Sequence, residues 1–351
     1  MYHDSDSTLE TGNIVSGGGR NISLGDYTEE WRAHRRLVHS ALHRCCQQSL
    51  HGVIERQALH LRKVLMDYQE TAVDLSEDFT VAASNVITTL AFGKEYDKTT
   101  PELQELHSCL NDIVALWGSS WISALDSFPL LRRPQQPGST GLWPSCCTDQ
   151  RHRELLLFKN LKHDIYTSCR LCLTSFFNVG QVQANVYEEI RTVLEGRYPK
   201  YSDRHRLPVL SSLINEMLRL RPVAPLAIPH RAIRDSSIAG YFIPKNTVII
   251  PNLFGAHHDP AVWSEPYSFK PERFLEGGGG STRLLMPFGG GARLCLGETV
   301  AKIELFLFTA YLLRDFQFVL PQSEGSLPDL RGVASVVLKV KAYKVIARPR
   351  P

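Results

Sequence analysis

The sequence predicts a mainly α-helical protein with small β-sheets. Up to Pro222, apolar side chains recur every three or four positions in most segments, which is the helical period. Beyond Pro222, short runs of β-branched residues alternate with turn residues, which is typical of short strands. The 351 residues are 43% hydrophobic and 21% charged, so the chain can form a sizeable core.

Helices account for most of the predicted elements. The first helix begins near Thr28, with Asp26 or Thr28 as its N-cap and two glutamates in its first turn. Gly93 ends a helix that the periodicity predicts over residues 76–92. The other helices are expected over residues 53–65, 103–117, 151–176, 182–195, 209–222 and 297–314.

Strands and loops are expected in four further regions. Residues 238–253 read as a hairpin around a Pro-Lys-Asn turn, and residues 335–347 have a strand pattern. Residues 1–24 are rich in Gly and Ser and are expected to be loose. Residues 25–351 then form a single domain. A Pro- and Gly-rich break opens an atypical segment over residues 134–180.

Composition excludes several classes of protein. A net charge of +3 does not indicate a nucleic-acid partner. The eight cysteines are scattered, as reduced thiols in the cytosol would be, and the Cys169–Cys172 pair lacks the second pair that a zinc site needs. The first residues lack the apolar core of a signal peptide. The longest apolar run, residues 305–313, is shorter than the ~18 residues of a membrane span.

The stretch PFGGGARLCLGE, residues 287–298, carries the clearest chemistry. A helix is expected just after Cys295, so free N–H groups would point back at the sulfur and favour a thiolate. Glycines allow close approach of a flat ligand, and Arg293 suits an anionic group beside it. This pattern favours a cradle for a metal cofactor with acidic side groups. The alternative is a glycine-rich turn around a buried cysteine.

Two other patterns combine cations with partners at helical spacing. Glu216 and Arg219 share a helix face among apolar residues, and Arg273 in PERF could complete a buried network; the alternative is a solvated surface pair. Trp31 and Arg35 also share a face, which suits a large ligand that bears carboxylates, or a core tryptophan beside a basic surface.

In chain order, these motifs are WxxxR (31–35), ExxR (216–219), PERF (271–274) and FxxGxRxCxG (288–297). The ordered set resembles the cytochrome P450 superfamily of haem-thiolate monooxygenases. LGDYTEEWRAHRRL, RLRPVAPLAIPHR and SSIAGYFIPKNTVIIPNLFGAHHD are similar to the microsomal steroid hydroxylases. Steroid 21-hydroxylase is the most similar group, and steroid 17α-hydroxylase/17,20-lyase is the next. The resemblance covers residues 22–133 and 181–348 well.

The resemblance implies an incomplete cytochrome P450 fold, with haem b as the cofactor of a single haem-binding domain. It implies Cys295 as the proximal iron ligand, whose thiolate pushes electron density to the iron. The residues at positions around the haem propionates are Trp31, Arg35, His230 and Arg293. A lone histidine such as His230 is more often a structural residue than a ligand contact, which is the alternative at this position. The residues at positions of a buried structural network are Glu216, Arg219 and Arg273.

The resemblance also implies an activity and its partners. A chain of this group hydroxylates progesterone or 17-hydroxyprogesterone at carbon 21, with O2 and electrons from an NADPH-cytochrome reductase. It does so at the cytosolic face of the endoplasmic reticulum membrane. The reductase is expected on a basic patch of the first helix, formed by Arg32, Arg35, Arg36 and Arg44.

The sequence departs from the family pattern in two places. The membrane anchor and first strands of the family are expected to be missing. The distal helix motif [AG]Gx[DE]T, which delivers protons to the reaction, has no match; residues 84–93 have threonines without the acid. No catalytic residue is therefore assignable. The alternative to an active enzyme is a non-catalytic haem-binding chain or an unstable fragment.

Overall fold

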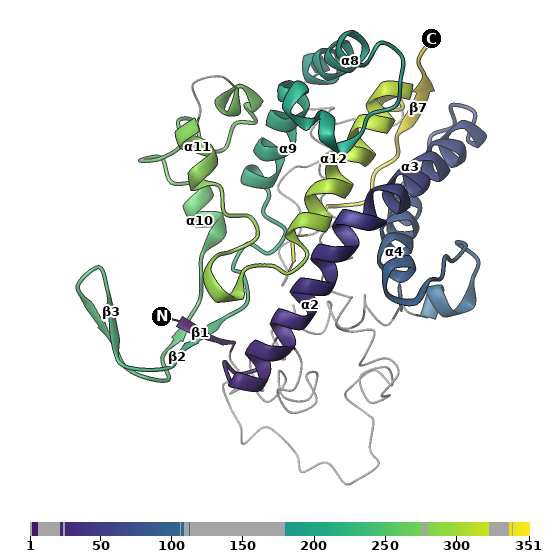
Figure 1. Cartoon of the computed structure of the whole chain (residues 1–351). Coiled ribbons are helices and arrows are strands. Elements are labelled where there is room, and N and C mark those ends of the chain that lie inside the picture. The colour runs from purple at the N-terminus through teal and green to yellow at the C-terminus, as the bar shows by residue number, and fades with distance from the viewer. Residues whose placement is uncertain are drawn as a thin grey trace.

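Helix α12 (Glu298–Asp315) lies at the centre of the helical part of the molecule, with α3 (Leu50–Asp67) on one side and α9 (Pro208–Leu220) on the other (Figure 1). Helix α8 (Gly180–Leu194) packs against both α9 and α12. Most side chains of α12 are buried, because neighbouring elements cover it on several sides. The ETVAKIELFLFTAYLL sequence is accordingly apolar around most of the helix.

The computed structural model describes residues 2–5, 22–23, 25–105, 107–108, 112, 180–275, 279–322, 337–338 and 340–351. The helix predicted over residues 151–176 and the Cys169–Cys172 pair lie outside the described residues, as does most of the helix predicted over 103–117. Within the described part, no helix is long and apolar enough to cross a membrane.

Capping residues explain why several predicted helix bounds are correct. Helix α2 (Glu29–Gln48) begins after Thr28, whose side chain accepts the backbone N–H of Trp31, so Thr28 is the N-cap. Helix α4 (Ser76–Phe92) ends at Gly93, which has a left-handed backbone with φ of +66°. The short helical turns are η3 (Tyr201–Arg206), α10 (Leu253–His257), η4 (Pro271–Phe274), α11 (Gly279–Leu284) and η5 (Gly291–Arg293).

The strands form three small antiparallel sheets. The first sheet has the order β1 (Tyr2–Ser5), β2 (His230–Ala232), β5 (Val248–Ile249). The second pairs β3 (Ser236–Ile238) with β4 (Tyr241–Ile243) and projects from the molecule (Figure 1). The third pairs β6 (Phe316–Val319) with β7 (Ile346–Pro349). The structure is thus mainly helical with small sheets, as the sequence predicts.

The predicted hairpin around the Pro-Lys-Asn turn is wrong. Strands β4 and β5 flank that turn but pair with different partners, β3 and β2. The hairpin turns instead at Ala239 and Gly240, which both have positive φ (+49° and +86°). A two-residue turn of this kind matches the twist of paired strands, which explains why β4 pairs with β3 rather than with β5.

Two other strand predictions need correction. The N-terminal segment is not wholly loose, because Tyr2–Ser5 pairs with β2 and satisfies its backbone groups there. Of the strand predicted over residues 335–347, the described residues pair only through a single bridge between Val345 and Val73 and then through β7. The sequence pattern missed β6, which follows α12 directly and pairs with β7.

Candidate functional site

The loop that carries Cys295 joins η5 to the first turn of α12. The backbone N–H of Cys295 donates to the carbonyl of Phe288 at 3.0 Å, and Glu298 at the start of α12 donates to the carbonyl of Cys295 at 3.4 Å. Gly289 and Gly291 have φ of +76° and +67°, which favours glycine. A Cβ atom added at either glycine would meet only open space, so this side of the loop has room for a ligand.

Trp31 contacts two guanidinium groups through its ring. The Cζ atoms of Arg293 and Arg35 are 4.0 and 5.3 Å from the centroid of its ring. The indole N–H donates to the carbonyl of Ile22 at 2.9 Å, and the side chain is buried. Cation–π contacts of this kind hold the two cations together against their mutual repulsion. The structure therefore brings the WxxxR motif of α2 onto the arginine of the cysteine loop.

Both arginines are also anchored through backbone carbonyls. Arg293 donates to the carbonyl of Gly25 at 2.6 Å, just before α2. Arg35 donates to the carbonyl of Leu294, the residue before Cys295. Burial lowers the pKa of Arg35, and the negative charge of the Cys295 thiolate opposes that effect. A thiolate at Cys295 is thus electrostatically coupled to the guanidinium of Arg35.

His230 lies on β2, outside this cluster. Its backbone pairs with Ser5 on one side and Ile249 on the other. The next residue, Arg231, forms an ion pair with Asp26 at 2.9 Å. Strand β2 is therefore tied to the segment before α2, the same segment that receives Arg293.

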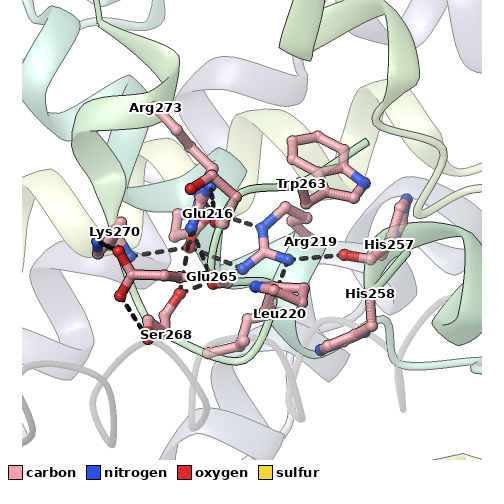
Figure 2. A network of polar contacts seen from close by, with 12 residues as sticks. Glu216, Arg219, Leu220, His257, His258, Trp263, Glu265, Ser268, Lys270 and Arg273 are labelled. Carbon is pink, nitrogen blue, oxygen red and sulfur yellow. Dashed lines mark hydrogen bonds and ion pairs between the residues drawn. The ribbon is translucent and has the colours of Figure 1, made fainter. Parts of the chain in front are cut away.

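Glu216 and Arg219 are fully buried and form the centre of a second cluster (Figure 2). The carboxylate of Glu216 accepts two hydrogen bonds from Arg219, at 2.7 and 2.9 Å. Arg219 also donates to the carbonyls of His257 and Pro266 at 2.6 and 2.8 Å. Neither side chain is exposed, so this is not a solvated surface pair.

Arg273 completes this cluster from η4. Its Nε lies 3.0 Å from one carboxylate oxygen of Glu216, and the backbone N–H of Lys270 donates to the other oxygen at 2.8 Å. A second bond from Arg273 reaches the carbonyl of Ser264 at 2.9 Å. Since two guanidinium groups and a backbone N–H surround one carboxylate, the buried charge of Glu216 is well compensated. The cluster ties α9 to the segment before the cysteine loop.

Two buried polar residues escape the sequence motifs. His257 accepts the Arg219 hydrogen bond through its carbonyl, yet the two adjacent histidines of GAHHD carry no periodic signal. Glu304 is fully buried in α12, and burial raises its pKa well above the usual range. Its signal was available: a carboxylate inside an apolar helical run is unusual unless it is paired or protonated.

Comparison with known proteins identifies the family. The sequence model of cytochrome P450 matches residues 6–140 and 167–347, so the chain belongs to the cytochrome P450 family. This match begins at residue 6, earlier than the resemblance seen in the sequence motifs, which begins at residue 22. Of the atypical segment 134–180, only residues 141–166 are not matched.

The relatives within this family are steroid hydroxylases. The chain is 33% identical to the steroid 17-alpha-hydroxylase/17,20 lyase of Ictalurus punctatus, over 97% of this chain and 77% of that protein. It is 33% identical to the steroid 21-hydroxylase of Sus scrofa, over 94% of this chain and 76% of that protein. A structure of a zebra fish cytochrome P450 with abiraterone superposes with a TM-score of 0.83 at 31% identity, over 99% of this chain and 88% of that one.

Proteins of this family bind a haem iron, and the residues present fit that group. Cys295 offers a thiolate at the end of a helix, and the loop beside it has open space. Arg35 and Arg293 offer two cations within reach of one tryptophan ring, which suits a ligand with two carboxylates. One thiol that can ligate a metal therefore lies near two guanidinium groups that can pair with carboxylates.

Proposed function

We propose that the chain holds haem b through the Cys295 thiolate and acts as a steroid monooxygenase of the 21-hydroxylase type. One observation carries the haem part of the proposal: Arg35 and Arg293 both contact the ring of Trp31, and Arg35 also donates to the carbonyl of Leu294, the residue before Cys295. Trp31, Arg35 and Arg293 are the residues proposed to hold the propionates, with His230 at the edge of the site. Glu216, Arg219 and Arg273 are proposed to hold the scaffold rather than the ligand.

The proposed reaction is hydroxylation of progesterone or 17-hydroxyprogesterone at carbon 21. The haem, when bound, supplies the activation of O2: one oxygen atom enters the steroid C–H bond as a hydroxyl and the other leaves as water, using two electrons and two protons. NADPH supplies the electrons through a reductase. The LGDYTEEWRAHRRL, RLRPVAPLAIPHR and SSIAGYFIPKNTVIIPNLFGAHHD stretches support the 21-hydroxylase assignment.

The haem site is tested by the carbon-monoxide difference spectrum of the reduced, haem-loaded protein. A thiolate ligand shifts the Soret band far to the red. We expect this shift in the wild type and its loss in Cys295→His, which keeps a metal ligand but not the thiolate. A wild-type protein that takes up haem without the red shift would contradict Cys295 as ligand.

Product analysis separates the two steroid activities. The haem-loaded protein is incubated with progesterone, NADPH and a reductase. A 21-hydroxylated product supports the proposal. A 17α-hydroxylated product, or loss of the side chain by carbon–carbon cleavage, supports the alternative, for which the similar identity to both groups of relatives leaves room.

A non-catalytic haem protein is the second candidate, and one observation favours it. The sequence contains no [AG]Gx[DE]T motif, so proton delivery on the distal side has no assigned residues. Such a chain would give the red-shifted spectrum but no hydroxysteroid, with NADPH oxidation uncoupled from product. Any steroid turnover that depends on the chain would refute this candidate.

The partners follow from the same resemblance. We propose that a flavoprotein reductase contacts the basic face of α2, where Arg32, Arg36 and Arg44 are exposed. Arg35, predicted to belong to this patch, is half-buried and turned to the Leu294 carbonyl. We further propose that the protein works at the cytosolic face of the endoplasmic reticulum membrane, which subcellular fractionation would test.

A further inference from the structure

His257 makes two bonds that point in different directions. It ends α10 and is fully buried. Its carbonyl accepts a hydrogen bond from the Arg219 guanidinium at 2.6 Å (Figure 2). Its ring Nε2 accepts the backbone N–H of Met286 at 2.9 Å. One residue therefore joins the buried Glu216–Arg219 cluster to the chain just before the cysteine loop.

Hydrogen bonds continue this connection toward the cysteine. The carbonyl of Met286 accepts the N–H of Gly289 at 3.1 Å. Two residues on from Met286, the carbonyl of Phe288 accepts the N–H of Cys295 at 3.0 Å. His257 thus bonds to Met286, the residue at which the segment leading to Cys295 begins to turn.

The state of the His257 ring is set by this bond. A backbone N–H can only donate, so Nε2 must lack a proton and the neutral ring carries its proton on Nδ1. Burial lowers the pKa of His257 to about 4, helped by the positive charge of Arg219. The ring therefore remains a hydrogen-bond acceptor at neutral pH, and no change of charge interrupts the connection.

His258 offers a natural comparison. This neighbouring ring is also buried and stacks on Phe254 at 3.9 Å between centroids. Its Nδ1 bonds with the carbonyl of Phe254 at 2.8 Å, within the same helical turn. The two adjacent histidines thus share burial and chemistry, but only the ring of His257 is bonded to Met286.

We propose that His257 is a positioning residue that fixes the start of the cysteine loop against the Glu216–Arg219 cluster. Through Met286 it holds Cys295 in the orientation that a metal ligand needs. Only the spectroscopic part of the test below rests on the proposed haem site.

The test compares two substitutions that differ in where they place a polar atom. In His257→Gln the side-chain amide reaches the position of Nε2, whereas in His257→Asn it stops near Nδ1. Amide hydrogen exchange of residues 286–296 is followed in the haem-free full-length chain. We expect exchange about tenfold faster in the Asn variant, as for loss of one buried hydrogen bond, and near-wild-type exchange in the Gln variant. His258→Gln, the matched control, leaves exchange in this loop unchanged.

The haem-loaded variants give a second readout. At equal haem content, we expect part of the red-shifted carbon-monoxide band of His257→Asn to be replaced by a band at shorter wavelength, which marks haem without a thiolate ligand. His257→Gln keeps the red-shifted band. Equal loop exchange in the two His257 variants, or equal acceleration in His258→Gln, overturns the proposal. If the wild type takes up no haem, the proposed function fails, while the exchange comparison still decides the role of His257.

Discussion

Two Glu-x-x-Arg pairs lie on neighbouring helices of this chain, and their surroundings differ. Glu216 and Arg219 on α9 are completely buried, and each nitrogen of the Arg219 guanidinium donates a hydrogen bond. Glu188 and Arg191 on α8 have the same spacing but are exposed to water, at 58% and 59% of their side-chain surface. Water screens the exposed pair, whereas removal of one buried partner leaves the other charge without compensation.

We therefore predict that replacing the arginine by alanine changes stability at the buried site but not at the exposed one. Arg219→Ala lowers the free energy of unfolding by about 3–5 kcal/mol, because Glu216 loses its main partner inside the protein. Arg191→Ala leaves it unchanged within error. Urea unfolding of both variants measures the difference. Equal stability of the two variants would contradict the role assigned to the buried cluster.

Glycine positions govern stability at the scale of elements. Gly93 ends α4 with φ of +66°, and a Cβ atom there would contact nothing. Gly52 lies within α3, also with open space around an added Cβ atom, but without positive φ. At neither site would an added Cβ atom clash with another described residue. The backbone conformation of each glycine therefore determines how a substitution by alanine changes stability.

The same change, Gly to Ala, is predicted to act in opposite directions. Gly93→Ala destabilises by about 1 kcal/mol, since an alanine disfavours the left-handed region. Gly52→Ala stabilises by about 0.5–1 kcal/mol, since alanine restricts the unfolded chain and favours a helix. Thermal or urea unfolding measures both. A loss of stability at Gly52 would show that the space around it is needed.

Glu304 gives α12 a predicted pH dependence. Its carboxylate oxygens are buried without hydrogen-bond partners among the described residues, and burial raises its pKa well above 4.5. The folded state therefore keeps a proton that the unfolded state loses above about pH 4.5. This contribution to stability is complete below that pH and is lost as pH rises, by up to about 1.4 kcal/mol per unit.

Glu304→Met should remove this slope while it fills a similar volume. We expect the free energy of unfolding of the wild type to fall, relative to the variant, as pH rises from about 5 to about 8. Urea unfolding at several pH values tests this. Parallel curves for the two proteins would mean that Glu304 has found a partner that ionises it in the fold.

Local signals account for what the sequence could predict at this scale. The C-terminal bound of α4 follows from Gly93, and the cysteine loop follows from its spacing of Gly, Arg and Cys. The partners of β4 and β5 could not be predicted from the local sequence. A turn between two strands does not determine whether they pair with each other or with other strands. His257 escaped for a related reason: its partners lie 29 and 38 positions away.

Charge distribution matters at the scale of the whole molecule. A net charge of +3 is small, so any steering of an acidic partner must come from a local patch. Arg36 and Arg44 are exposed on α2, the helix whose other side carries Trp31 to the cysteine loop. The proposed reductase face and the proposed haem site thus share this one helix.

Charge reversal tests this face. We predict that Arg36→Glu together with Arg44→Glu slows reduction of the haem-loaded protein by a reductase about tenfold or more at low salt, and removes most of the salt dependence. Arg191→Glu, which makes the same kind of change on α8, should have little effect. Equal slowing by Arg191→Glu and by Arg36→Glu alone, which change the net charge by the same amount, would indicate that net charge alone matters. Stopped-flow reduction measures the rates.

The bonds that close the candidate site also set the order in which the protein can be made. Arg293 reaches the carbonyl of Gly25 across 268 positions, and Arg35 reaches that of Leu294 across 259. Contacts of such high sequence separation form slowly and only after both ends exist. On the ribosome, α2 emerges long before the loop that it must meet. Helix α2 is therefore made well before its partner loop, and the candidate site can bind a cofactor only after both segments exist.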